Sequence, residues 1–237
     1  MTDLLFSEAP NTATFVCTHV WEQGAPILYV SHDANGDWQF LCGAVHEDPK
    51  ECLLLHLGHV VERDPSLNLV AGMCTAHVAE RANATAEWTV RDETLDHIRE
   101  VIAEHGWWVG LLGEEDGQPP FAYTIGLHET FGHAEIIIVG LPLDSMHRIL
   151  NVCGKLVREG TRFSDGASST EVLEGYDVRF RSVVAQESYD GFLGYGCRFF
   201  GDERFAVLQC VWPDKAHKFP GEEGAASFLA AAQPLLP

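Results

Sequence analysis

The stretch Phe121-Ala-Tyr-Thr-Ile-Gly-Leu-His-Glu-Thr-Phe-Gly-His-Ala-Glu-Ile-Ile-Ile-Val-Gly-Leu141 decides the fold of the second half of the chain. It predicts a strand over residues 121–127, a loop that carries two histidines and a glutamate, and a second strand over residues 135–141. The unbroken Ile and Val run of the second strand is typical of a strand buried on both faces. A helix is expected from about residue 144 to 159, because apolar residues recur along one helical face.

The sequence around this stretch predicts further strands and helices. A helix that opens at Asp92 ends at Gly106, because glycine readily takes the left-handed conformation that stops a helix. Residues 187–201 are aromatic, glycine-rich and irregular. Further strands are expected at residues 107–112, 176–180 and 204–212, and a terminal helix at residues 225–232.

The first half predicts a small sheet and one helix. Three short β-rich runs are separated by strong turn signals, which predicts an antiparallel meander. These runs are residues 14–20, 26–31 and 38–42. Asp48-Pro-Lys-Glu51 has the cap, the proline and the capping-box glutamate of a helix start, and the helix is expected to end before Asp64. A last strand is expected at residues 74–80.

The small residues from Ala82 to Ala86 predict a linker between two halves. A chain of 237 residues fits one large domain or two small ones. We therefore expect an α+β protein of two small domains, residues 1–90 and 91–237. Each is expected to be a mainly antiparallel sheet with one or two packed helices.

The chain is strongly acidic, with 35 acidic residues against 15 Lys and Arg and a formal net charge of −20. The acids are spread over both halves. A field of that sign repels phosphate backbones, which argues against direct binding of nucleic acid. It also attracts a basic protein and speeds its association, so the charge predicts a basic protein partner. Solubility alone is the other explanation of the same charge.

The sequence also predicts a cytoplasmic protein that does not enter a membrane. The N-terminal stretch lacks the basic start and the long apolar core of a signal peptide. The most apolar run, residues 136–143, is shorter than the roughly 20 residues that span a bilayer. The 7 cysteines are scattered without a Cys-x-x-Cys pair, and we expect free thiols.

The loop His128-Glu-Thr-Phe-Gly-His133 is the strongest candidate for a site. A carboxylate beside two imidazoles can orient a base, relay protons or bind a metal. The spacing differs from the helical His-Glu-x-x-His motif of metalloproteases. The alternative is that both imidazoles satisfy backbone groups in a glycine-rich turn. The candidate pocket consists of His105, Tyr123, Thr124, His128, Glu129, His133 and Asp214.

Arg179 and Arg181 point the same way on their predicted strand and form a candidate anion patch. The alternative is that they pair with surface acids, which is common. Cys52, His56 and His59 would share one stripe of the helix predicted from Asp48, which makes them weak candidates for zinc. A fourth ligand is not evident, and the sequence has no P-loop, dinucleotide fingerprint or Gly-x-Ser-x-Gly elbow. We therefore expect no metal and no other cofactor.

Several short motifs of the second half occur in a recognisable order. They are His105-Gly-Trp107, Phe121-Ala-Tyr-Thr-Ile-Gly-Leu127, Ile149-Leu-Asn151, Leu208-Gln-Cys-Val-Trp-Pro-Asp214 and Phe219-Pro220. With these motifs, the chain from about residue 93 to 224 resembles the bacterial domain-of-unknown-function family 4262. It departs from the family at Ala134, where a proline is common, and at Gly221, where an aromatic residue is usual. The resemblance implies a fold and no settled chemistry.

The first half carries a second set of motifs: Pro26-Ile-Leu-Tyr-Val30, Gly36-Asp-Trp-Gln-Phe-Leu-Cys-Gly43 and Asp64-Pro-Ser-Leu67. With these, residues 14–81 resemble the domain-of-unknown-function family 2185, which is classed among the immunity proteins of polymorphic toxin systems. The family usually shows Ser-Gly-Trp where this chain has Gly36-Asp-Trp38. The resemblance implies an immunity-type domain.

Two functions follow from these observations. The first is an acidic cytoplasmic binding protein, an immunity-type or other protein-interaction module that neutralises a basic, toxin-like partner. The aromatic residues within 187–200 are its candidate anchors. The alternative is a small enzyme or ligand-binding domain, for a metal or a flavin, with its pocket around His128, Glu129 and His133. The absence of a catalytic motif favours the first.

Overall fold

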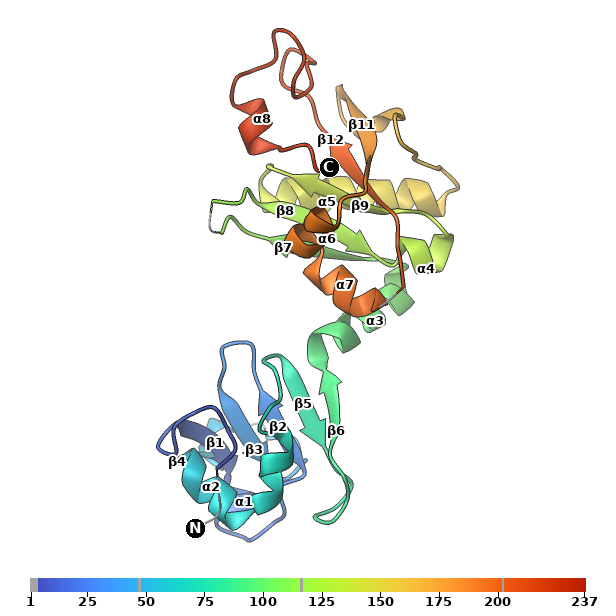
Figure 1. Ribbon diagram of the computed structural model, residues 1–237. Helices are drawn as coiled ribbons and strands as arrows, with labels where there is room; N and C mark the ends of the chain where they lie inside the picture. The colour runs from blue at the N-terminus through green and yellow to red at the C-terminus, as the bar shows by residue number, and fades with distance from the viewer. Residues whose placement is uncertain (1–3, 47, 116, 202) are drawn as a thin grey trace. The chain divides into compact units, whose positions relative to one another are not determined.

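The computed structural model describes residues 4–46, 48–115, 117–201 and 203–237. The chain forms two compact units, of which one ends at His97 and the other begins at Ile98. Within the described residues each unit contains a six-stranded, mainly antiparallel sheet with helices packed on it (Figure 1). The α+β prediction is therefore confirmed.

The first unit is built on a sheet with the strand order β4-β1-β3-β2-β5-β6. Its elements are, in chain order, β1 (Ala13–Cys17), α1 (Thr18–Trp21), β2 (Tyr29–His32), β3 (Trp38–Leu41), the 3₁₀ turn η1 (Pro49–Glu51), β4 (Cys52–His56), α2 (Leu57–Arg63), the 3₁₀ segment η2 (Pro65–Val70), β5 (His77–Glu80) and β6 (Thr89–Asp92). The core contains apolar side chains of α2 and η2 packed with Val16, Val30 and Phe40 of the sheet.

The predicted antiparallel meander is wrong for its first strand. β2 and β3 do form an antiparallel hairpin, closed by Asp33, whose carboxylate accepts from the backbone N–H of Asn35 and Asp37. However, β1 pairs with β3 in parallel and with β4 in antiparallel. The helical turn α1 carries the chain away from β1, so β2 enters the sheet on the far side of β3.

The helix predicted from Asp48 is also wrong in its first part. Asp48 does cap a turn, since its carboxylate accepts from the N–H of Lys50, but the turn is only the short η1. The chain then extends as β4, and α2 begins at Leu57. The physical reason is tertiary: five residues of β4 pair with β1, and this pairing outweighs the local helix signal.

The segment between Ala82 and Ala86, predicted as a linker, connects β5 to β6 within the first sheet. Arg81 holds this turn. Its buried guanidinium donates to the carbonyl oxygens of Ile27 and Ala84 and pairs with Asp64. After β6 the chain enters α3 (Glu93–His105).

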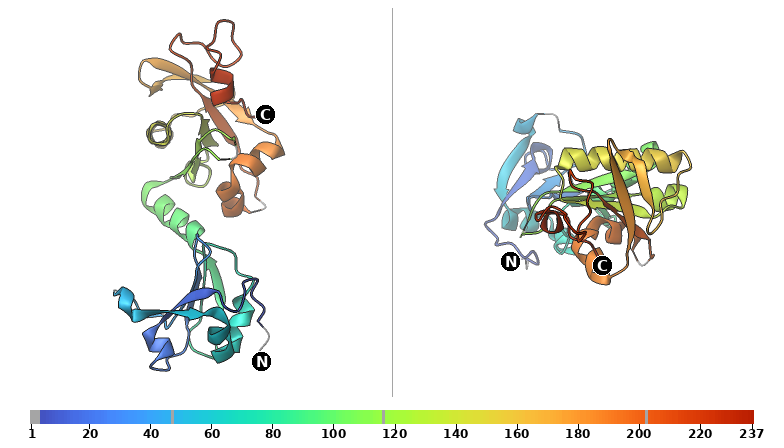
Figure 2. Two further views of the ribbon diagram at one scale, coloured as in Figure 1. Left: turned by 90° about the vertical axis from the view of Figure 1, so that its left-hand side faces the viewer. Right: turned by 90° about the horizontal axis from the view of Figure 1, so that it is seen from above.

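The second unit is built on a sheet with the order β10-β11-β12-β9-β8-β7. Its elements are β7 (Trp108–Leu112), β8 (Phe121–Ile125), α4 (Leu127–Phe131), β9 (Glu135–Val139), α5 (Leu143–Arg158), β10 (Ser168–Leu173), β11 (Tyr176–Val183), α6 (Gln186–Phe192), α7 (Gly194–Phe200), β12 (Val207–Val211) and α8 (Leu229–Ala232). Helix α5 covers one face of the sheet, and α6 and α7 lie on the other (Figures 1 and 2). β8 and β9 lie between these layers and are buried along their whole length, as predicted for β9.

Four points of the sequence-based prediction for this unit need correction. Residues 187–201 form the helices α6 and α7 and are not irregular. The terminal helix is only the four-residue α8, and the strand β10 is not in the sequence-based prediction. The predicted loop from His128 to His133 contains the short helix α4. Gly126, at φ 114°, makes the turn into that helix, a conformation that side-chain-bearing residues rarely take.

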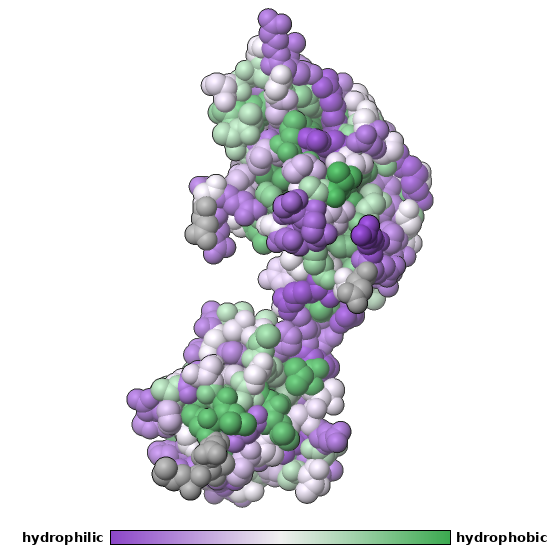
Figure 3. Space-filling model, viewed as in Figure 1, coloured by the Kyte–Doolittle hydropathy of each residue, from purple (hydrophilic) through white to green (hydrophobic). Residues whose placement is uncertain are grey.

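In the part of the chain that the structure describes, none of the helices has the length and apolar character of a membrane span. Figure 3 shows polar side chains over much of the visible surface of each unit, with smaller apolar patches between them.

Candidate functional site

Glu135 is the buried polar centre from which the segment around α4 is built. Its carboxylate has no exposed surface. One oxygen accepts from the N–H of Gly126 at 2.8 Å and of His128 at 2.9 Å, and the other accepts from the Thr124 hydroxyl at 2.6 Å. Burial raises the pKa of Glu135, and the hydrogen bonds from His128 and Thr124 oppose that rise. The carboxylate thereby ties the end of β8 to the start of α4.

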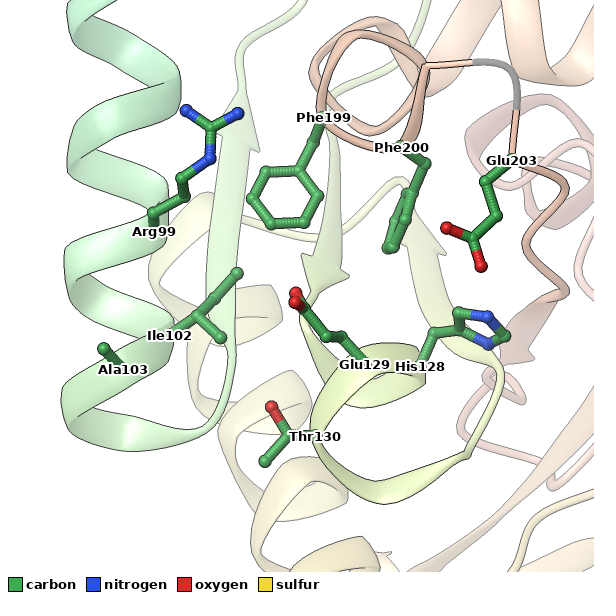
Figure 4. Close-up of a pocket in the computed structure, with 9 residues that line it drawn as sticks. All are labelled: Arg99, Ile102, Ala103, His128, Glu129, Thr130, Phe199, Phe200 and Glu203. Carbon is green, nitrogen blue, oxygen red and sulfur yellow. The ribbon is translucent and has the colours of Figure 1, made fainter.

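This arrangement positions three side chains of α4 at a surface hollow of about 840 Å³. Helix α3 contributes Arg99, Ile102 and Ala103, α4 contributes His128, Glu129 and Thr130, and Phe199, Phe200 and Glu203 come from the end of α7 and the segment after it. Figure 4 shows the two phenyl rings reaching from α7 toward α4. We call this set the α3–α4–α7 hollow.

The α3–α4–α7 hollow combines aromatic faces with carboxylates. Glu129 and Glu203 are exposed, and Phe199 and Phe200 are half-buried. In Figure 4 the Glu129 side chain points toward the Phe199 ring, and the Glu203 carboxylate points toward the His128 imidazole. The guanidinium of Arg99 lies over the Phe199 ring at 5.6 Å. A phenyl face in this hollow therefore already contacts a cation.

The Phe200 ring is fixed by its neighbours. It stacks on Phe205 with ring centroids 4.4 Å apart, and the His128 ring meets it edge-on at 5.8 Å. Phe205 is itself buried. The aromatic side of the hollow is therefore held in place before any ligand arrives.

The structure brings only two of the predicted pocket residues, His128 and Glu129, to this hollow. His133 is buried elsewhere and bound to the backbone on both sides of its ring. Its Nε2 accepts from the N–H of Phe163 at 3.0 Å, so Nδ1 carries the proton and donates to the carbonyl of Ala134 at 2.6 Å. Burial lowers the pKa of His133, with the charge of Arg162 as a smaller contribution. His133 has the structural role that the sequence left as the alternative.

Tyr123 and Thr124 are buried neighbours on β8. The Tyr123 hydroxyl accepts from the N–H of Tyr195 at 3.1 Å, and burial raises its pKa above the ordinary value. Thr124 completes the Glu135 network by accepting from the N–H of Ile136. Tyr123 thereby joins β8 to α7, and Thr124 joins β8 to β9.

His105 and Asp214 lie at the ends of other elements. His105 is exposed at the end of α3, with Nε2 3.7 Å from a carboxylate oxygen of Glu104. Asp214 organises the loop after β12, because its carboxylate accepts from the N–H groups of Ala216, Lys218 and Ala226. Backbone hydrogen bonds, from Lys218 first, lower the pKa of Asp214. Neither residue lines the α3–α4–α7 hollow.

Arg179 and Arg181 both line a smaller hollow of about 260 Å³ beside β11. Arg179 donates to Glu222 at 2.6 Å and lies over the Phe219 ring at 3.7 Å. The ion pair with Glu222 is the arrangement that the sequence left as the alternative to an anion patch.

The weak zinc candidates Cys52, His56 and His59 do not share a helical stripe, so that prediction is wrong. Cys52 and His56 are the first and last residues of the strand β4. A strand rises about 3.3 Å per residue, which separates them by about 13 Å, and one ion does not span that distance. Only His56 and His59 lie close, with ring centroids 5.5 Å apart.

Seven residues that line the hollow were not candidates for the pocket: Arg99, Ile102, Ala103, Thr130, Phe199, Phe200 and Glu203. Phe199 and Phe200 both fall within residues 187–200, whose aromatic residues were named as candidate anchors, and this was the signal that the sequence offered. Their meeting with α4 depends on α7, about 70 residues later in the chain, which the sequence did not predict.

Comparison with protein families bears on this second unit. The family model described as Domain of unknown function (DUF4262) matches residues 101–226, which is more than half of the chain. The chain belongs to the DUF4262 family. The prediction for the second half is therefore confirmed, and every hollow-lining residue except Arg99 falls inside the DUF4262 match. The resemblance of the first half to family 2185 is not shown and stays a prediction. Neither the comparison with curated proteins nor that with solved structures gave a match.

Proposed function

We propose that this DUF4262 protein is a protein-binding module whose α3–α4–α7 hollow receives a basic side chain of its partner. The single observation that carries the proposal is that two exposed carboxylates, Glu129 and Glu203, line the same hollow as the phenyl rings of Phe199 and Phe200. A guanidinium or ammonium group gains from both, through an ion pair and through the ring face.

Two further features support a basic partner. The formal net charge of −20 gives a field that attracts a basic protein at long range and speeds the encounter. Arg99 over Phe199 is an intramolecular example of the contact that the partner would make. Aromatic residues in a preformed depression are typical anchors of binding energy at interfaces.

The experiment uses the full chain and a probe of defined chemistry. The ring signals of Phe199 and Phe200 are followed by NMR during titration with acetyl-Gly-Arg-Gly-amide, and in parallel with the citrulline peptide, which has the same shape without the charge. We expect saturable shifts with the arginine peptide only. Equal shifts with both peptides would contradict recognition of a cation.

The charge variants separate the hollow from general acidity. Glu129→Gln combined with Glu203→Gln removes the two carboxylates of the hollow. Glu171→Gln combined with Glu174→Gln removes the same formal charge from exposed residues outside it. The proposal requires the first pair to abolish the arginine response and the second pair to preserve it. An equal loss in both would leave only non-specific attraction.

An immunity-type role is the finer form of this proposal. It is supported by the acidity of the chain and by the resemblance of the first half to family 2185, and it makes the partner a basic, toxin-like protein. Co-expression with a toxin encoded beside the gene should rescue cells, and the Glu129→Gln/Glu203→Gln variant should rescue them less. Failure of the unaltered protein to rescue would overturn the immunity role.

A small-ligand or enzymatic site is the second candidate, favoured by the way the Glu203 carboxylate faces the His128 imidazole in Figure 4. Such a pair can orient a general base. This candidate predicts that His128→Ala abolishes the binding of a metal or a flavin by the purified protein, as measured by elemental analysis and by absorption. A colourless, metal-free protein that is unaffected by His128→Ala would exclude it.

A further inference from the structure

Two cysteines and two histidines converge in the first unit, far from the α4 segment in sequence. They are Cys17, His19, Cys42 and His46, and their ligand atoms all lie within 4.8 Å of one another. Cys17 is the last residue of β1, His19 lies in α1, Cys42 follows β3 directly, and His46 lies in the segment before η1. We call this set the Cys₂His₂ cluster.

The fold explains why the four residues meet. β1 and β3 run in parallel, with Val16 opposite Phe40, so the strands end at the same edge of the sheet. Cys17 and Cys42 are the residues at those two ends. The short helix α1 begins directly after Cys17 and places His19 beside His46. The centroids of the two imidazole rings lie 5.3 Å apart.

His46 is held in the orientation of a metal ligand. Its Nδ1 lies 3.2 Å from a carboxylate oxygen of Glu51, and its Nε2 lies 3.7 Å from the Cys42 sulfur. When Nδ1 donates its proton to Glu51, Nε2 presents a lone pair to the middle of the cluster. A carboxylate behind a ligating histidine fixes the ring and raises its basicity in many metal sites. The His46 side chain is only 7% exposed.

His19 supplies an independent indication that a ligand binds in the cluster. Its Nδ1 is buried and has no hydrogen-bond partner among the described residues. A buried polar atom without a partner costs about 1–3 kcal/mol, so such atoms are rare unless something else satisfies them. A cation bound in the cluster would satisfy this one.

Cys17, like the Nδ1 atom of His19, lies in the interior of the first unit. Its side chain is fully buried, so the sulfur is shielded from solvent. A bound cation displaces the thiol proton and offsets the cost of burying the charge.

We propose that Cys17, His19, Cys42 and His46 bind one Zn²⁺ ion in a tetrahedral structural site. Two sulfur and two nitrogen ligands are a donor set that zinc prefers, and four protein ligands leave no open position for a substrate. Ligand atoms on a tetrahedral zinc lie about 3.3–3.8 Å apart, from bond lengths of about 2.0–2.3 Å. Side-chain rotations that bring the four atoms together by about 1 Å complete the site. The ion would join the ends of β1 and β3 to α1 and to the segment that carries His46.

The test uses the reduced full chain, stripped of metal and titrated with Co²⁺ and then Zn²⁺. Tetrahedral Co²⁺ bound by thiolates absorbs in the visible and near-ultraviolet, and Zn²⁺ removes the colour on displacement. We expect one equivalent of either ion to bind. Cys42→Ser and His46→Ala should lose the Co²⁺ absorption, and Glu51→Gln should weaken binding by about 10–100-fold, because it removes the partner of the His46 ring.

Cys74→Ala is the matched control, because Cys74 is an exposed thiol of the same unit outside the cluster. It should bind the full equivalent. Circular dichroism identifies variants that fail to fold, and for these the Glu51→Gln result decides. Three outcomes would overturn the proposal: no binding by the folded, reduced chain, equal loss in Cys74→Ala, or a Cys17–Cys42 disulfide whose reduction restores no metal binding.

Discussion

The α4 segment and the Cys₂His₂ cluster treat their buried polar side chains differently. Around α4, Glu135 and His133 are buried, and the structure gives each a partner at every side: backbone N–H groups and a hydroxyl for the carboxylate, and a carbonyl and an N–H for the imidazole. In the Cys₂His₂ cluster, the buried Nδ1 of His19 has no such partner within the described residues. The difference teaches that a satisfied buried polar group holds the fold, whereas the unsatisfied His19 atom, which lies among three other potential metal ligands, has room for a ligand to satisfy it.

The largest expected effect tests the satisfied side of this comparison. Glu135→Ala leaves the buried N–H groups of Gly126 and His128 without an acceptor, and each such group costs about 1–3 kcal/mol. We expect the free energy of unfolding of the second unit to fall by about 3 kcal/mol or more, measured by urea denaturation. Glu171→Ala, at an exposed position, should change it by less than about 0.5 kcal/mol. A small effect of Glu135→Ala would break the comparison.

Addition of metal tests the other half of the comparison, the Cys₂His₂ cluster. If Zn²⁺ binds only the folded first unit, free metal at 100-fold its dissociation constant stabilises that unit by about 2.7 kcal/mol. Hydrogen exchange of the backbone amides measures this unit by unit. Protection should rise in β1 and β3 and stay constant in β8 and β9. An equal rise in both units would show that the metal acts elsewhere.

His133 gives the next effect and makes it depend on pH. Because its folded-state pKa is lowered, the unfolded chain binds more protons below about pH 6.5, so the histidine makes the second unit less stable as the pH falls through that value. His133→Phe should cost about 2 kcal/mol at pH 7.5, through the unpaired N–H of Phe163. It should also reduce the loss of stability between pH 7 and pH 5. Parallel pH profiles for the variant and the unaltered protein would contradict this assignment.

The smallest expected effect on stability lies at Glu129, which separates binding from folding. Glu129→Gln changes an exposed carboxylate of the α3–α4–α7 hollow, so the free energy of unfolding should shift by less than about 0.5 kcal/mol. The same variant should weaken the response to the arginine peptide. A large loss of stability would place Glu129 with Glu135 among the side chains that hold the fold.

The sequence was informative where the signal is local. The apolar run of β9 and the buried stripe of α5, which includes Met146, Leu150 and Cys153, were predicted because the period of the pattern reports burial directly. The helix α4 was missed because its first turn depends on Glu135, which reaches back from the next strand. A carboxylate that acts as a cap from that distance leaves no capping pattern at the start of the helix.

The candidate sites were harder because both join distant segments. His128 and Glu129 were named from their own loop, but Phe199, Phe200 and Glu203 reach them only through the packing of α7. The metal cluster is divided between a Cys-x-His pair at residue 17 and a Cys-x₃-His pair at residue 42, and neither has the spacing of a zinc finger. Only the parallel pairing of β1 with β3 reveals that the two pairs meet.

That parallel pairing of β1 with β3 also has a consequence for the order in which the strands of the first sheet pair during folding. Parallel neighbours cannot be joined by a tight turn, so the β1–β3 contact closes a longer loop than the β2–β3 hairpin does, and we expect it to form after the hairpin. The two cysteines at the ends of these strands therefore come together only when β1 pairs with β3. We therefore expect an ion that needs both cysteines to bind after the β1–β3 contact has formed, and to slow the unfolding of the sheet more than it speeds its folding.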